Sequence, residues 1–211
     1  VSEESGSADV PWGTRLVLPL LETRVTFQLD QMELDSIARG AKDADLAALE
    51  DAARRVALFE ESAIYNGFEP ARVEGILQQK AHQPISLPKN TQDFPAVVAQ
   101  ALESMRLAGI EGPFVLVLGS EAWAGLMQSG SGGYPPQRII SELMQCDLQM
   151  SPAIKGGVLI SKAKGNFELT IGQDFSIGYV GHGRNKVELY LSESFTFRVL
   201  EPKGCVSLSP G

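Results

Sequence analysis

The chain has 211 residues, of which 44% are hydrophobic and 21% are charged, and its formal net charge is −8. This length predicts one large domain or two small ones, and the apolar content suffices for a packed core, which excludes a chain that is disordered throughout. The 18 lysines and arginines are scattered among 26 acidic residues. This argues against nucleic acid as a partner, because phosphate recognition relies on clustered basic side chains.

No stretch approaches the roughly 20 consecutive apolar residues of a membrane span, and the first residues lack the basic-then-apolar pattern of a secretion signal. We therefore expect neither a membrane partner nor export. The two cysteines, Cys146 and Cys205, form no disulfide framework and no zinc-binding spacing. They are expected to be free thiols in a reducing cytoplasm.

The amino-terminal region predicts a lead-in, an arm and a strand. Residues 1–11 carry three acids and three serines and are expected to be mobile. The segment 15–29 ends in alternation, with Val25 and Phe27 on one face, which predicts a strand. Pro19 cannot donate to a β-ladder, so the first half of this segment is expected to be an extended arm that needs a partner to cover it.

Three helices are predicted next. Asp30 and Glu33 have the spacing of a capping box before a short helix, which Gly40 would end. Apolar residues that recur at intervals of three and four predict a long helix that lies across a sheet, and then a third helix. The three predicted helices are residues 32–39, 44–66 and 93–108.

The second half of the chain predicts more strands. The run 114–119 is short and wholly apolar, as in a buried strand, and Ser120 would cap the helix that follows. The stretch 128–133 is predicted to be an exposed loop before another helix around 139–144. From Val158 onward, alternating residues predict antiparallel strands. The fold class is therefore α+β, with helices concentrated earlier in the chain.

The residue patterns that enzyme chemistry requires are not found. His82 and His182 are far apart in the sequence and do not form the paired histidines of a metalloprotease, so no metal site is predicted. Ser120 lacks the flanking glycines of a nucleophile elbow. The glycine-rich loop at 130–133 lacks the lysine and the spacing of a phosphate-binding loop.

One further trio of residues has the types found in a hydrolase triad. Asp174 could orient His182 as a base, with Ser176 or Ser192 as the nucleophile. Proximity in sequence does not establish such a geometry, and most trios of this kind are accidental. No catalytic residue is therefore predicted.

Several longer segments, in order, resemble one known family. The first begins at Trp12 and reads PWGTRLVLPLLETRVTFQLDQMELDSIARG, and EESAIYNG, GIEGPFVLVLG and the loop that ends in GGYP follow. The last two read IGQDFSIGYVG and VELYLSESFTFRVLEP, and end at Pro202. These segments resemble the encapsulin shell proteins, also called the linocin-type bacteriocin family.

The resemblance implies the fold of tailed-phage major capsid proteins. That fold has a peripheral domain with a spine helix, here 44–66, an axial domain that points to the symmetry axes, and an extended loop that reaches over a neighbour. The implied division is a lead-in and returning strand of the extended loop at 1–20, the peripheral domain at 21–113, the axial domain at 114–161, and strands that return to the peripheral domain at 162–211.

The same resemblance implies a function. Encapsulin shells are closed icosahedra in the cytoplasm of bacteria or archaea, and they enclose a cargo enzyme, commonly a ferritin-like iron oxidase or a dye-decolorising peroxidase. The chain would be a self-assembling structural subunit without chemistry of its own, whose partners are its own copies and the docking peptide of the cargo. Iron storage or defence against oxidative stress would be the role of the nanocompartment.

The resemblance implies three sites, and the residues of one of them, the groove, have a second possible role. For the groove residues, packing within the strand core is an equally open interpretation. The implied sites are a five-fold pore loop (Gln128, Ser129, Gly130, Ser131, Gly132 and Gly133), an inter-subunit arm (Trp12, Leu16 and Leu18), and a cargo-peptide groove (Ile177 and Tyr179).

Two departures from the family pattern matter. The family's amino-terminal helix, which forms part of the groove, and the outgoing half of the extended loop have no recognised counterpart, so we expect most of a shell subunit without its first segment. Met32 stands where some relatives carry a Trp linked to flavin binding, so no flavin or other cofactor is predicted. Two alternative functions stay open: a phage or prophage major capsid protein, and a hydrolase of the bacteriocin or peptidase type on the same fold.

Overall fold

The structure is a computed structural model that describes residues 2–3, 13–15, 17–129 and 134–211. Its helices are α1 (Gln31–Ala38), α2 (Ala47–Asn66), α3 (Phe94–Leu107), α4 (Ser120–Gln128) and α5 (Pro136–Arg138), the last continuing as a π-helical turn at Ile139–Leu143. Its strands are β1 (Ser2–Glu3), β2 (Gly13–Thr14), β3 (Leu21–Asp30), β4 (Ile85–Ser86), β5 (Phe114–Leu118), β6 (Cys146–Met150), β7 (Gly157–Ser161), β8 (Phe167–His182), β9 (Lys186–Val199) and β10 (Cys205–Ser209).

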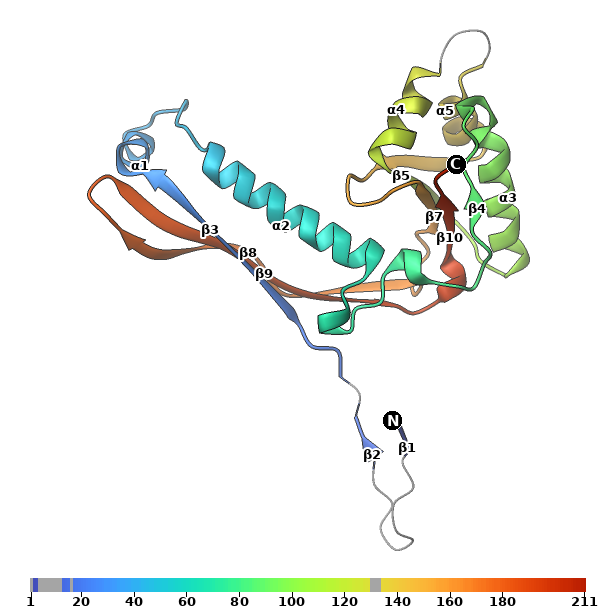
Figure 1. Cartoon of the computed structure of the whole chain (residues 1–211), viewed down its shortest axis with the longest axis horizontal. Helices are drawn as coiled ribbons and strands as arrows, with labels where there is room; N and C mark the ends of the chain where they lie inside the picture. Colours follow the sequence, from blue (N-terminus) through green and yellow to red (C-terminus); the bar gives the residue numbers. More distant parts are fainter. Residues whose placement is uncertain (1, 4–12, 16, 130–133) are drawn as a thin grey trace, which may run out of the picture.

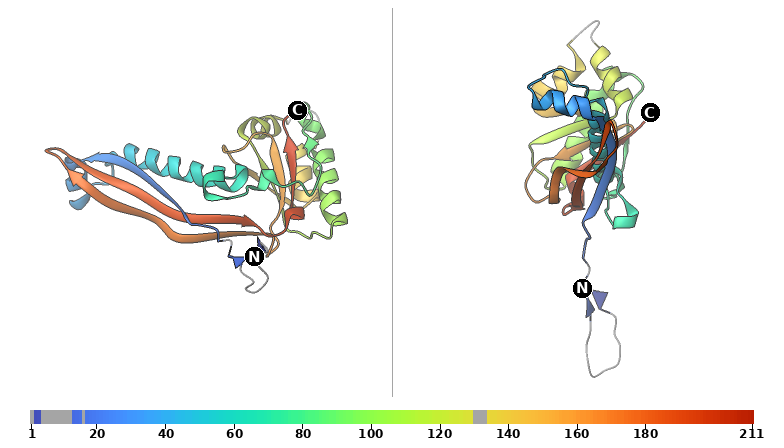
Figure 2. Two further views of the ribbon diagram at one scale, coloured as in Figure 1. Left: turned by 60° about the horizontal axis from the view of Figure 1, so that its bottom comes forward. Right: turned by 90° about the vertical axis from the view of Figure 1, so that its left-hand side faces the viewer.

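The described elements form an elongated wing and a compact unit (Figure 1). The wing consists of the long sheet β3-β9-β8 with helices α1 and α2, and the compact unit is built around the sheet β4-β10-β7-β5-β6 with α3, α4 and α5. The carboxyl terminus lies on the compact unit, whereas β1 and β2 extend away from both parts (Figure 2). This mixed architecture confirms the predicted α+β class.

The wing sheet is antiparallel, and its register places apolar residues on one face. Val25 of β3 lies opposite Leu191 of β9, and Phe27 lies opposite Leu189. These odd-numbered positions face the helix, while the even-numbered positions of β3 are exposed. The strand predicted from this alternation is confirmed at Leu21–Asp30, and residues 17–20 precede it without strand pairing, in agreement with the constraint at Pro19.

Helix α2 lies along the wing sheet, as its apolar stripe predicted. Ala52 and Val56 pack with Phe27 and Leu191, and Ala63 lies near the other end of the helix in a second cluster with Phe195. The helix begins three residues later than predicted, where the Asp45 carboxylate accepts the backbone N–H of Ala47 at 3.0 Å.

Helix α1 begins as the capping pattern predicted, with one difference. The Asp30 carboxylate accepts the N–H of Met32 at 2.8 Å. Glu33 does not complete the box, because its carboxylate instead accepts the N–H of Asp45 at 3.1 Å. The acidic side chain thus ties α1 to the chain segment that enters α2.

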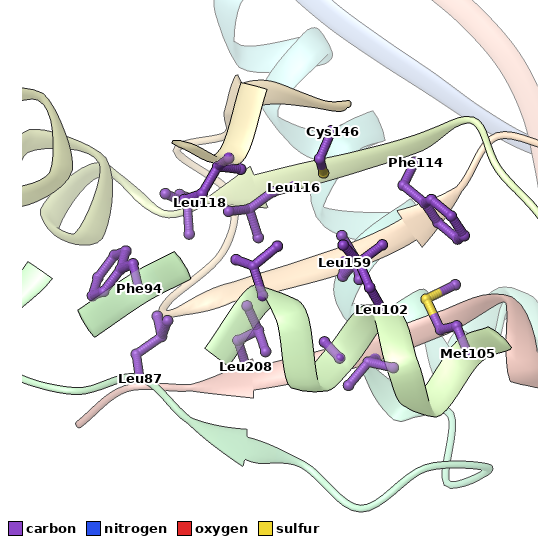
Figure 3. Packing of buried hydrophobic residues seen from close by; sticks show 14 of the residues in the cluster. Leu87, Phe94, Leu102, Met105, Phe114, Leu116, Leu118, Cys146, Leu159 and Leu208 are labelled. Atoms are coloured by element: carbon purple, nitrogen blue, oxygen red, sulfur yellow. The ribbon is translucent and has the colours of Figure 1, made fainter. Parts of the chain in front are cut away.

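The compact unit has a core on each face of its sheet. Strands β5 and β7 are buried throughout. One face, which includes Leu116 and Leu159, packs against Leu102 and Met105 of α3 (Figure 3). On the other face, Val117 and its neighbours join the cluster that contains Phe195 of the wing. This second cluster contains side chains of both parts and so joins the compact unit to the wing.

Three features of the compact unit differ from the sequence expectations. Strands β4, β6 and β10 were not predicted, and the pairs β4–β10 and β5–β6 are parallel, so the sheet is mixed rather than antiparallel. Ser120 is the first residue of α4 and makes no capping hydrogen bond. The sheet also includes residues from outside 114–161, and the division into peripheral and axial domains stays a prediction.

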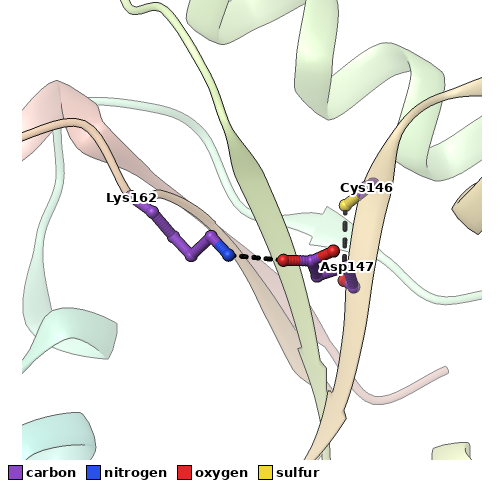
Figure 4. Close-up of polar contacts among 3 residues, drawn as sticks. All are labelled: Cys146, Asp147 and Lys162. Carbon is purple, nitrogen blue, oxygen red and sulfur yellow. Dashed lines mark hydrogen bonds and ion pairs between the residues drawn. The ribbon is translucent and has the colours of Figure 1, made fainter.

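The β6 edge of this sheet carries a polar contact that crosses β5. Lys162, directly after β7, donates to the Asp147 carboxylate of β6 (Figure 4). The preceding Cys146 is buried, with its sulfur 3.6 Å from the Asp147 carbonyl oxygen. In the part of the chain that the structure describes, no helix combines the length and the apolarity that crossing a membrane requires.

Candidate functional site

Strand β8 carries a strip of exposed apolar side chains on the helix-facing side of the wing. Ile177 lies opposite Leu191 and Tyr179 lies opposite Leu189, and directly paired side chains share one face of a sheet. Helix α2 packs on β3 and β9, so the side chains of β8 beside it stay open. Ile177 is 55% exposed and Tyr179 is 57% exposed. The strip is completed along the strand by Leu169 and Ile171, and we call these four residues the β8 strip.

The structure therefore brings the two predicted groove residues together on one open surface. In the single chain both side chains are exposed and do not pack in its core. The Tyr179 hydroxyl hydrogen-bonds to Nδ1 of His182, which holds the ring toward the end of the β8–β9 hairpin. Whether this surface takes a cargo peptide stays a prediction.

The predicted arm is only partly within the described residues. Trp12 and Leu16 lie outside them, whereas Leu18 is described and is 39% exposed. Leu20 is half exposed and lies against Gly172 of β8, which fixes the end of the arm to the wing. Whether the exposed apolar residues before β3 contact a neighbouring subunit stays a prediction.

A short strand pair precedes the arm and corrects one expectation. Ser2 pairs with Thr14 and Glu3 pairs with Gly13 in an antiparallel arrangement. Residues 2–3 were expected in a mobile lead-in, and the outgoing half of the extended loop was expected to be missing. The pairing places residues 2–3 in a strand rather than in a mobile lead-in, and the absence of the outgoing half of the extended loop stays a prediction.

The predicted pore loop is anchored at both ends. Gly130, Ser131, Gly132 and Gly133 lie outside the described residues. At the start, the Ser129 hydroxyl donates to the carbonyl oxygen of Gly125 at 2.7 Å and contacts the Thr91 hydroxyl, while Gln128 is exposed as the last residue of α4. The Ser129 hydroxyl is thus engaged by two groups of the protein at the start of this loop.

At the far end of this loop, Tyr134 is held by the π-helical turn Ile139–Leu143 that continues α5. Its hydroxyl donates to the Glu142 carboxylate at 2.5 Å, and Arg138 lies 3.7 Å from the same carboxylate. The hydrogen bond to Glu142 raises the pKa of Tyr134. The hydroxyl therefore stays protonated at neutral pH and keeps donating.

The hydrolase trio is not assembled. Ser176 and Ser192 are paired across β8 and β9, and the Ser176 hydroxyl donates to the Ser192 carbonyl oxygen at 3.4 Å. His182 lies six residues further along β8, about 20 Å away at strand spacing. Asp174 accepts the N–H of Phe175. A base that far from the nucleophile cannot remove its proton.

The sequence analysis predicted neither a bound flavin, because of Met32, nor a metal site. Met32 is 73% exposed on α1 and offers no aromatic plane. Within the described ranges, no group of three His, Cys, Asp or Glu side chains is arranged to hold a metal ion.

Comparison with known families places the chain. Residues 1–196 match a family model described as the encapsulating protein for peroxidase. The match starts earlier than the resemblance recognised from Trp12. A type 1 encapsulin shell protein of Rhodospirillum rubrum is 44% identical over 195 residues, which are 92% of this chain and 70% of the relative. Another from Rhodococcus erythropolis is 37% identical over 191 residues, 90% of this chain and 72% of that protein.

Solved structures show the same fold. A virus-like particle from Pyrococcus furiosus has a TM-score of 0.68 at 17% identity, and the similarity covers 90% of this chain and 76% of that one. A structure of Mycobacterium phage Che8 has a TM-score of 0.60 at 18% identity and covers 96% and 75%. These confirm the predicted capsid-like fold. Together with the family match and the curated relatives, they show that the chain belongs to the encapsulin shell protein family.

Proposed function

We propose that the chain is a structural subunit that assembles with copies of itself into a closed icosahedral shell around a cargo enzyme. The observation that carries this proposal is the surface of a single chain, which is 13137 Å². A compact monomer of 22.7 kDa exposes about 9,500 Å². The excess indicates that one chain alone is not the functional unit.

The residues outside the described ranges do not account for this excess. An unfolded chain exposes about 1.45 Å² per dalton, so these 15 residues contribute at most about 2,400 Å². An excess of about 1,200 Å² is left, which matches the scale of a standard protein interface. The thin wing with its β8 strip is where such surface is expected to be covered.

In a closed shell, neighbouring subunits would cover this excess surface. In a ring of head-to-tail contacts, every subunit offers one patch and receives another, and a rotation that closes leaves no patch uncovered. The arm with Leu18 would add to this by pairing its backbone with a neighbour, as an added strand does at an open sheet edge. We expect no catalytic activity and no bound flavin in the shell itself.

The β8 strip is the proposed docking surface for a peptide of the cargo. Ile177 and Tyr179 offer adjacent apolar side chains at strand spacing, which suits an extended peptide with apolar residues. The description of the family supports a peroxidase as the cargo, and a ferritin-like iron oxidase is the second candidate. Iron storage or defence against oxidative stress in the cytoplasm would follow from the cargo's chemistry.

The loop 128–133 is the proposed lining of a five-fold pore. Glycine and serine residues leave backbone groups rather than bulky charges near the axis, so ions and metabolites pass while the cargo protein is retained. The anchors at Ser129 and Tyr134 would keep the mouth of the pore in place.

The cargo proposal is tested by identifying the proteins that purify with the native particle. Particles are isolated from the native host, washed at high salt and analysed by mass spectrometry, and the expected result is a peroxidase or a ferritin-like protein in a fixed ratio to the shell. Particles that contain neither protein would contradict this proposal.

A further inference from the structure

Glu193 of β9 is a carboxylate buried beneath the spine helix α2. The residue is 2% exposed, and its Oε2 has no hydrogen-bond partner among the described residues. Its neighbours on the same face of the strand are Leu191 and Phe195, which belong to the two apolar clusters that contain α2 side chains. If the carboxyl ionises, its Oε2 has lost water without gaining a donor, which is unfavourable.

The groups that face Glu193 from the packed elements do not neutralise it. Helix α2 contributes Glu60, and β8 contributes Asp174 from the irregular stretch between Gln173 and Ser176. On β3, Thr23 lies directly opposite, but its hydroxyl donates to the Glu193 backbone carbonyl at 3.3 Å.

The nearest cation along β3 is directed elsewhere. The Arg24 guanidinium lies 3.6 Å from the centre of the Tyr190 ring, and both residues occupy even-numbered positions on the opposite face of the sheet. Over the described part of the chain, none of the ion pairs includes Glu60, Asp174 or Glu193. Carboxylates on three elements therefore act on one another electrostatically, without a basic partner among the described residues.

This environment raises the pKa of two of the carboxyls. Burial first, and then the negative charges of Glu60 and Asp174, raise the pKa of Glu193 from 4.5 to about 7. Burial, followed by the charges of Glu61 and Asp174, also raises the pKa of Glu60. Protonation removes the charge that has no partner, so the neutral form of Glu193 is the one that fits the apolar interface.

We propose that Glu193 is a proton-binding site that couples the packing of α2 on the wing sheet to pH. When the carboxyl is protonated, it packs as a neutral group between Leu191 and Phe195. When it ionises, its charge faces Glu60 and Asp174, and the contact between the helix and β9 weakens. This inference concerns the single chain and does not depend on the proposed shell or cargo.

The sign of the pH dependence follows from the direction of the shift. The folded protein holds the Glu193 proton up to about pH 7, whereas the unfolded chain releases it near pH 4.5. The folded state therefore binds more protons between these values, and its stability from this group falls as pH rises. The contribution is fully present below about pH 4.5 and is lost above about pH 7.

Thermal unfolding between about pH 5 and 8.5 tests this. The protein expressed from its complete gene is compared with Glu193→Gln, which keeps the shape of the side chain but carries no charge. The unfolding midpoint of the wild type is expected to fall as pH rises toward 7, and Glu193→Gln is expected to lack this decline and to be the more stable protein at pH 8. The matched control is Glu188→Gln, on the same strand but the opposite face, which should retain the wild-type slope. Equal pH slopes for wild type and Glu193→Gln would overturn the proposal.

A second variant and a direct readout keep the test decisive if Glu193→Gln does not fold. Glu60→Gln removes one of the facing charges from the helix and leaves the buried residue intact, so the decline is expected to move to lower pH. Infrared spectroscopy should detect a protonated carboxyl near pH 6 that disappears by pH 8.5, with its midpoint moved in Glu60→Gln. A signal whose midpoint is the same in both proteins contradicts the assignment.

Discussion

The ring of Tyr190 on β9 lies directly against Gly178 on β8. The two residues are paired across the strands, and a Cβ added to Gly178 would collide with Cζ, Cε1 and Oη of the ring. The same ring carries the Arg24 guanidinium, so the absence of a side chain at Gly178 makes room for a contact that joins all three strands of the wing.

Gly178→Ala is therefore expected to destabilise the wing by about 1–3 kcal/mol, the range for overpacking at a filled site. Chemical denaturation measures the change. Gly181→Ala on the same strand is the matched control, because a Cβ there meets nothing within 4 Å. The control should stay within about 0.5 kcal/mol of the wild type. Equal effects at both glycines would show that the Tyr190 ring does not need the space.

The core of the compact unit makes a second prediction. Leu116 of β5 is 0% exposed and packs under α3, so Leu116→Ala should lower the free energy of unfolding by about 2–5 kcal/mol through lost burial and a cavity. Leu107 of α3 is 83% exposed, and Leu107→Ala should change it by less than about 0.5 kcal/mol. A small loss at Leu116 would contradict the packing seen in the structure.

The thiols give a third prediction. Cys146 and Cys205 are free thiols, as the sequence predicted. Both are buried, and burial raises the pKa of each to about 12. At pH 8 both stay protonated, so a maleimide should label the native protein at least about tenfold more slowly than the denatured protein. Lys164→Cys adds an exposed thiol as the control, which should react at once. Fast labelling of the native wild type would contradict the burial of these residues.

The β8 strip gives a fourth prediction, which rests on the proposed docking. Replacing both Ile177 and Tyr179 by Asp puts two charges where a peptide would bury apolar side chains. Full burial of one such apolar side chain contributes about 1.5–3 kcal/mol of binding free energy. Cargo that purifies with the shell should fall at least about tenfold, while particle size stays unchanged. Leu107→Asp places a charge at an exposed apolar site on α3 and should retain cargo. Retention of cargo by the double variant would exclude the strip as its docking surface.

The sequence predicted the long elements because their patterns are strong. The apolar stripe of α2 and the alternation of β3 and β9 each repeat over many residues, so the correct period was evident. Strands β4 and β10 were missed because they are short and because β10 gains its partners from distant parts of the chain. Such strands are defined by tertiary pairing and not by local propensity.

The surfaces could be predicted only in part. Alternation placed Ile177 and Tyr179 on one face, but their exposure depends on which strands α2 covers, and that is set by packing between distant segments. Glu193 was missed although a signal was present, since it is the charged residue in an apolar row between Leu191 and Phe195. A charged residue in such a row indicates a buried group that requires explanation.

Electron microscopy of the negatively stained protein, expressed from its complete gene and kept under native conditions, tests the central claim most directly. The account predicts closed particles of uniform size with icosahedral symmetry. Small discrete oligomers alone, without closed particles, would contradict it.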